Sequence, residues 1–126
     1  MGMFNSIHAD IRCSVTGEVS RDSEIQIKWQ EQRARLLDRY HVGDVLPDVE
    51  PGFDNTWIRT EFICEACSPK TKAGEHGEYI RTEDQRWHIV FVEIRDAEVV
   101  RILPEAEFEA LGVSDYVDDV WPPAPR

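Results

Sequence analysis

Residues 56–67 read Thr56-Trp57-Ile58-Arg59-Thr60-Glu61-Phe62-Ile63-Cys64-Glu65-Ala66-Cys67 and combine a strand pattern with a cysteine pair. The first eight are rich in β-branched and aromatic side chains, so they predict a β-strand. Cys64 and Cys67 follow with two residues between them. This spacing can turn both thiolates toward one point, as a metal ion or a disulfide requires. The strand would therefore deliver the chain to a candidate site.

A second strand is predicted over residues 86–95, where apolar side chains alternate. One face would carry Trp87, Ile89, Phe91 and Glu93, and the other His88, Val90, Val92 and Ile94. Residues 96–97 form a tight connection, and residues 98–103 return as the hairpin partner. A short helix is predicted from Pro104 to Leu111, because proline suits the first turn and Gly112 suits the end. Phe108 and Leu111 would press this helix onto the sheet.

The N-terminal part predicts a strand over residues 7–13, which ends at Cys13, and a turn in which Gly17 takes a positive φ. A strand over residues 24–29 would pair with the first. Residues 30–40 then favour a short exposed helix or a loop.

One alternative remains open in this part. A single helix from Ser23 to Tyr40 would place Ile25, Trp29, Leu36 and Tyr40 on one face. A short strand is also predicted over residues 41–46, and a surface loop over residues 47–55, where two prolines and a glycine interrupt any regular pattern. Residues 68–77 are polar and read as a loop.

These elements predict an α+β, β-rich fold: an antiparallel sheet of hairpins, with one short C-terminal helix. We expect a single globular domain over residues 1–113, followed by an acidic, proline-rich tail over residues 114–126. No apolar run is long enough to span a bilayer, and no signal peptide is visible. Three cysteines make a poor disulfide framework, so we expect a cytoplasmic location.

The chain is strongly acidic, with 14 Lys and Arg against 25 Asp and Glu and a net charge of −11. Such a surface repels phosphate backbones, which argues against sequence-independent nucleic-acid binding. Solubility alone explains an acidic surface, and a basic protein partner is the more specific interpretation.

Two segments resemble the knuckles of zinc ribbons. Cys13-Ser14-Val15-Thr16-Gly17 is similar to a Cys-Pro-x-Cys-Gly knuckle, with Ser14 replacing the proline and Thr16 the second cysteine. Cys64 to Cys67 resembles an intact second knuckle, approached by a strand. The resemblance covers residues 7–67 and implies that the two turns meet in space.

The resemblance implies a zinc site that contains Cys13, Cys64 and Cys67. Thr16 is a poor ligand, so we predict His76, in the loop after the second knuckle, as the fourth donor. His8, His41 and a water molecule are the alternatives for that position. The cysteines could also be reduced, packed thiols without metal, or Cys64 and Cys67 could form a redox pair.

Other candidates are weaker. His88 lies in the middle of a predicted strand and is interpreted as a packing residue, although a Cys64, His88 and Asp84 triad can be written. Trp29, Trp57 and Trp87 fall on predicted strands and are assigned to the core. Trp121, between the acidic tail and its prolines, is the tryptophan that would meet a partner.

Three hypotheses for function follow. The first is a non-enzymatic acidic binding module, and its most concrete form is an inhibitor or immunity-type protein that meets a basic protein. The second is a zinc- or thiol-dependent enzyme that uses the Cys13, Cys64 and Cys67 cluster. The third is a nucleic-acid-binding zinc ribbon, which the charge disfavours.

Overall fold

The structure is a computed structural model and describes residues 5–27, 29, 38–72 and 77–119. Its strands are β1 (Ser6–Arg12), β2 (Val19–Gln26), β3 (Arg39–Tyr40), β4 (Thr56–Ile63), β5 (Thr71–Lys72), β6 (Glu78–Tyr79), β7 (Trp87–Arg95), β8 (Glu98–Pro104) and β9 (Val117–Asp118). The helices are the 3-10 turns η1 (Pro51–Phe53) and η3 (Thr82–Asp84) and the α-helix α1 (Glu105–Ala110). The predicted α+β, β-rich fold is confirmed.

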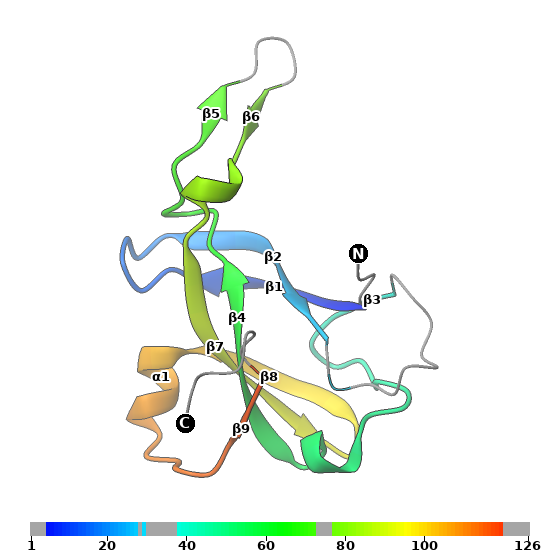
Figure 1. The fold of residues 1–126 in the computed structure, drawn as a ribbon. Helices are drawn as coiled ribbons and strands as arrows, with labels where there is room; N and C mark the ends of the chain where they lie inside the picture. Colours follow the sequence, from blue (N-terminus) through cyan, green and yellow to red (C-terminus); the bar gives the residue numbers. More distant parts are fainter. Residues whose placement is uncertain (1–4, 28, 30–37, 73–76, 120–126) are drawn as a thin grey trace.

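The strands form two main sheets, ordered β2-β1-β3 and β8-β7-β4-β9, and a small β5-β6 hairpin. The hairpin projects from the top of the molecule, well away from α1 (Figure 1). The β4–β7 pairing is antiparallel and regular from Thr56 opposite Ile94 to Ile63 opposite Trp87. Both strands and the β7–β8 hairpin lie where the alternation of side chains predicts them.

The main apolar core lies between the two sheets. It is built from Ile7, Ile11, Ile25, Ile27, Trp29, Ile58, Phe62, Val90, Val92, Ile94 and neighbouring buried side chains. A smaller cluster of Trp57, Phe91 and Phe108 covers the other face of the β4–β7 pair. Trp29 and Trp57 are buried, as expected. The assignment of Trp87 to the core is wrong, because its side chain is 50% exposed.

The short helix α1 is present and buries Phe108. Leu111 departs from its prediction, because it follows the last helical residue and remains 44% exposed. The domain boundary at residue 113 stays a prediction. Within the segment assigned to the tail, β9 pairs in parallel with β4 through Val117 and Asp118.

The N-terminal part differs from the prediction at the start of β2, and it decides the alternative that the sequence left open. β2 begins at Val19, five residues before the predicted start at residue 24. The added residues include Ser20 and Ser23, which are buried and whose hydroxyls hydrogen-bond each other, so a polar segment forms part of the strand. The single helix from Ser23 to Tyr40 is excluded, since its two ends lie in β2 and β3. Most of the predicted helix or loop over residues 30–40 lies outside the described residues.

The predicted strand over residues 41–46 is a turn instead. The amide of Asp44 donates to the carbonyl of His41, and the amide of His41 donates to the Asp44 carboxylate. Val45 retains a single bridge to Glu98. The polar segment over residues 68–77 contains β5 in place of a continuous loop. Among the described residues, no helix has the length and apolar character needed to cross a membrane.

Candidate metal centre

Three sulfurs and one imidazole converge between the two sheets. Cys13, Cys64, Cys67 and His88 each offer one donor atom, and these four atoms lie within 4.8 Å of one another. Three chain segments supply them: the turn after β1, the turn after β4, and the start of β7. All three cysteines are free thiols. The two predicted turns therefore meet, and the cluster could hold a metal ion.

The turn that carries Cys13 is closed by its own backbone. The amide of Gly17 donates to the carbonyl of Cys13 at 2.9 Å, and Gly17 takes a φ of +78°. The amide of Thr16 points at the Cys13 sulfur, with an N···S distance of 3.4 Å. An amide directed at the sulfur stabilises its thiolate form, which is the form that binds metals.

The turn that carries Cys64 and Cys67 is held by Ser68, whose side chain is buried. The amide of Ser68 donates to the Cys64 carbonyl at 3.2 Å, and its hydroxyl accepts from the amide of Arg86 at 3.0 Å. The Cys64 amide donates to the carbonyl of Arg86 at 2.9 Å. The turn is thus fastened to the residues that lead into β7.

A further hydrogen bond links this turn to the other sheet. The amide of Glu65 donates to the hydroxyl of Ser20 in β2 at 3.1 Å. Ser20 is almost completely buried. The cysteine pair is therefore positioned by both sheets, and not only by β4.

His88, interpreted from the sequence as a packing residue, lies with the three cysteines and offers the fourth donor atom of the cluster. The antiparallel register places it opposite Phe62, two residues before Cys64. Its Nε2 atom lies 2.9 Å from the sulfur of Cys67. The sequence carried a signal for this position, because the alternation of β7 already put a histidine on the core face at the strand's beginning.

The sulfurs are shielded from solvent to different degrees. Cys13 and Cys64 are 1% and 0% exposed, whereas Cys67 and His88 are half-buried. Burial raises the pKa of the Cys13 thiol, but hydrogen bonds, chiefly from Thr16, outweigh it and lower the pKa to about 7. Burial and the neighbouring Cys64 and Cys13 sulfurs raise the pKa of Cys67 to about 12.

The opposite shifts are those expected of thiols that crowd one another. One thiolate is favoured by the amides around it, and each further negative charge is opposed by the first. A bound cation reverses this balance, since it compensates several thiolates at once. The donor set therefore has the chemistry of a cation site.

The geometry also suits a tetrahedral ion. With Zn–S bonds of about 2.3 Å and a Zn–N bond of about 2.0 Å, the donor atoms of a tetrahedral site lie about 3.5–3.8 Å apart. All donor separations of the cluster lie within 4.8 Å, and the Cys67 sulfur and the His88 Nε2 atom are 2.9 Å apart, so this pair would open slightly as an ion enters between the four donors.

Two of the other predicted donors, His8 and His41, lie elsewhere. His76 lies outside the described residues. His8 is buried in β1, where its ring contacts Ser6 and Asp22 at 2.8 and 3.2 Å. His41 is exposed in the turn it forms with Asp44. Neither His8 nor His41 belongs to the sulfur cluster found among the described residues.

The suggested triad of Cys64, His88 and Asp84 also fails. The Asp84 carboxylate accepts from Arg81 at 2.7 Å, and His88 contacts a sulfur.

Comparisons with protein-family models, with curated proteins and with solved structures gave no match for this chain.

Proposed function

We propose that this protein is a non-enzymatic binding module whose two sheets are joined by a structural zinc ion. The observation that carries the proposal is the convergence of Cys13, Cys64, Cys67 and His88. Each donor comes with hydrogen bonds or strand pairing that fix its position. Such pre-positioning favours a specific ion site over an accidental meeting of thiols.

Zinc is the metal that fits this donor set best. Three thiolates and one imidazole in a tetrahedron form a known class of structural zinc site, and carboxylate-preferring cations such as Mg²⁺ and Ca²⁺ have no oxygen ligand among these four side chains. The ion would connect the β1–β2 turn to the β4–β7 pair. It would therefore stabilise the contact between the two sheets.

A structural role is favoured over a catalytic one because four protein donors fill the tetrahedron. Catalytic zinc sites keep one position for water or substrate. The pKa of Cys13 is lowered to about 7, but Cys13 and Cys64 are buried away from any substrate, and the high pKa of Cys67 keeps its thiol protonated, which argues against a thiol nucleophile. A redox role for Cys64 and Cys67 lacks the helix N-terminus that such pairs use, since residues 71–72 after the turn form β5.

The test is elemental analysis of the purified protein and of matched histidine variants. We expect one zinc ion per chain in the wild type and in His76→Ala. We expect the zinc to be lost in Cys64→Ser. In His88→Ala the affinity for zinc should fall at least about tenfold, because even substitutions of residues that only orient the ligands cost that much.

A replacement by another good ligand is the sharpest control. His88→Cys creates a four-cysteine set, which also binds zinc in structural sites, so this variant should retain the ion. Zinc that survives in Cys64→Ser, or that is lost in His76→Ala but kept in His88→Ala, would contradict the proposed ligand set. A wild type without metal after purification and after zinc titration would contradict the proposal as a whole.

The binding role is supported by the net charge of −11, which favours a basic protein partner. An inhibitor or immunity-type activity toward such a partner is the most concrete form of this proposal. The relation to zinc ribbons stays a prediction, supported by the meeting of the two knuckle-like turns.

A further inference from the structure

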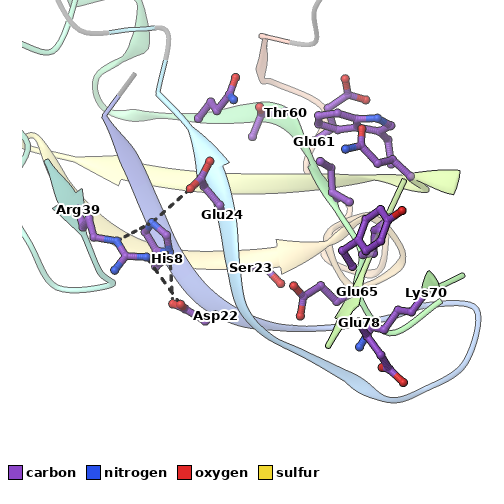
Figure 2. A pocket seen from close by; sticks show the side chains of 16 residues that line it. His8, Asp22, Ser23, Glu24, Arg39, Thr60, Glu61, Glu65, Lys70 and Glu78 are labelled. Carbon is purple, nitrogen blue, oxygen red and sulfur yellow. Dashed lines mark hydrogen bonds and ion pairs between the residues drawn. The ribbon is translucent and has the colours of Figure 1, made fainter. Parts of the chain in front are cut away.

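A large open groove lies beside the metal cluster, on another surface of the same strands. Its volume is about 1470 Å³, and it is lined by β2, the second half of β4, β6 and the first residue of β7. Figure 2 shows side chains from these elements pointing into one hollow. The groove is large enough for several residues of a peptide.

Acidic side chains dominate the charged groups of the groove. Its carboxylates are Asp22, Glu24, Glu61, Glu65 and Glu78, and its permanent cations are Arg39 and Lys70. The groove therefore has an excess of negative charge, and it would attract positively charged groups.

The ion pairs of the groove lie at one end, and Lys70 is the cation at the other end, beside Glu65 and Glu78 (Figure 2). Arg39 lies 3.8 Å from the Asp22 carboxylate and donates to the His8 ring at 3.2 Å. At the other end, where Figure 2 shows Glu65 and Glu78, both residues are exposed. Neither of these two carboxylates forms an ion pair within the part of the chain that the structure describes.

Two exposed aromatic rings line the same groove. Tyr79 and Trp87 are 49% and 50% exposed, although rings of this size are usually buried. Aromatic faces beside carboxylates bind guanidinium and ammonium groups, because the ring quadrupole attracts a cation.

The groove lies between two strand edges, one of β2 and one of β4. β2 is the last strand of its sheet, and among the described residues β9 pairs with β4 only at Ile58 and Arg59. A peptide in extended conformation can add to a strand edge through its backbone and place alternate side chains in pockets. The shape of the groove therefore favours an extended occupant.

We infer that this groove binds an extended segment of a partner protein that is rich in Arg or Lys. The inference rests on the proposed function, since it assigns the site and the chemistry of the binding module. Cationic side chains would pair with Glu65 and Glu78 and stack on Trp87 and Tyr79. The segment's backbone would follow the edge of β2 or β4.

The probe is a short fluorescein-labelled synthetic peptide in which Arg alternates with Thr, measured by fluorescence anisotropy on zinc-loaded protein. Binding should weaken as salt is raised. The same peptide with Glu in place of Arg should not bind, and neither should a labelled single-stranded oligonucleotide. Stronger binding of the oligonucleotide than of the Arg peptide would overturn the inference.

Matched double variants separate the groove from the general acidity of the surface. Glu65→Gln with Glu78→Gln should weaken the Arg peptide by about five- to tenfold, from two lost ion pairs. Glu107→Gln with Glu109→Gln removes the same charge from α1 and should change binding by less than about twofold. Equal effects of the two pairs would overturn the inference.

Single substitutions test the aromatic and the cationic side chains of the groove. Trp87→Leu should weaken binding about threefold, whereas Trp87→Phe, which keeps a ring, should weaken it less. Lys70→Gln removes a positive charge and should tighten binding. Weaker binding by Lys70→Gln would contradict the proposed polarity.

Zinc content, measured on the same samples, distinguishes the two proposals. Protein with zinc that does not bind the Arg peptide would overturn the groove assignment alone. Folded protein without zinc that still shows the Glu65 and Glu78 dependence would overturn the structural zinc ion and leave the groove assignment supported.

Discussion

The two halves of β7 are held in place by different kinds of interaction. In the first half, His88 meets three sulfurs whose thiolate forms repel one another. In the second half, Phe91 stacks on Phe108 with ring centroids 3.7 Å apart, and the Glu93 carboxylate accepts from Arg95 and Arg101 at 2.9 Å each. The first half brings together four atoms that could bind a metal ion. In the second half, Phe91 and Glu93 find their stacking and ion-pair partners within the chain.

This difference indicates which region depends on a ligand. Apolar burial and ion pairs between neighbouring strands form whenever the sheet forms. Four converging donors become stabilising only when a cation neutralises them. We therefore expect the α1 side of the sheet to be independent of metal and the cysteine side to depend on it.

The largest effect is expected from removing zinc with a chelator. The free energy of unfolding should fall by on the order of 5 kcal/mol, below the roughly 10–16 kcal/mol of small zinc fingers, because this domain also has an apolar core. Hydrogen exchange should accelerate at the amides of Thr16, Gly17 and Ser68, and stay slow in the second half of β7. The Cys64→Ser variant, which should hold no zinc, is the control and should not respond to the chelator. Uniform acceleration across β7 would remove the distinction between its halves.

The next effect is expected on the other face of the sheet, from Phe108→Ala. Phe108 is 3% exposed and packs against Phe91 and against Trp57, 5.0 Å between ring centroids for the latter pair. Its loss should cost about 3–4 kcal/mol by chemical denaturation, since a large ring leaves a cavity. Zinc content should remain at one ion per chain. Loss of zinc in this variant would show that the two regions are coupled.

Local patterns predicted one of these regions much better than the other. The face of β7 that carries Phe91 and Glu93, and the helix that brings Phe108 to it, follow from alternation and from Pro104 and Gly112. The fourth donor atom of the cluster did not follow, because His88 becomes a neighbour of Cys64 only through the register of β4 and β7. Pairing the two predicted strands antiparallel, end to end, would have placed that histidine beside the cysteine turn. Trp87 was misassigned for a related reason, since alternation identifies a face and not what covers it.

A smaller effect is expected from Glu93→Gln. Burial raises the pKa of Glu93, but hydrogen bonds from Arg95 and Arg101 outweigh it and lower the pKa below its usual range. The carboxylate should therefore add about 1–2 kcal/mol of stability, part of it screened because both arginines are about half exposed.

The pH dependence of this effect has a definite sign. Because the pKa is lower in the folded state, the contribution is complete above the unfolded-state value of about 4.3 and is lost as the pH falls through the folded-state pKa. Denaturation curves of wild type and Glu93→Gln should thus differ at pH 7 and converge in acid. Glu98→Gln, an exposed carboxylate on the neighbouring strand, should change stability by less than about 0.5 kcal/mol. A difference that persists in acid would mean that Glu93 acts by packing and not by charge.

The smallest effect is expected from Leu111→Ala. The sequence predicts that Leu111 presses the helix onto the sheet beside Phe108, whereas the structure leaves its side chain 44% exposed after the last helical turn. Removing a half-exposed side chain loses little apolar burial and leaves no enclosed cavity, so the cost should be about 0.5–1 kcal/mol. The comparison with Phe108→Ala in the same denaturation experiment is decisive, because both residues belong to the same helical segment. A cost for Leu111→Ala that approaches that of Phe108→Ala would mean that the helix buries both side chains, and that the metal-independent face of the sheet extends beyond Phe108.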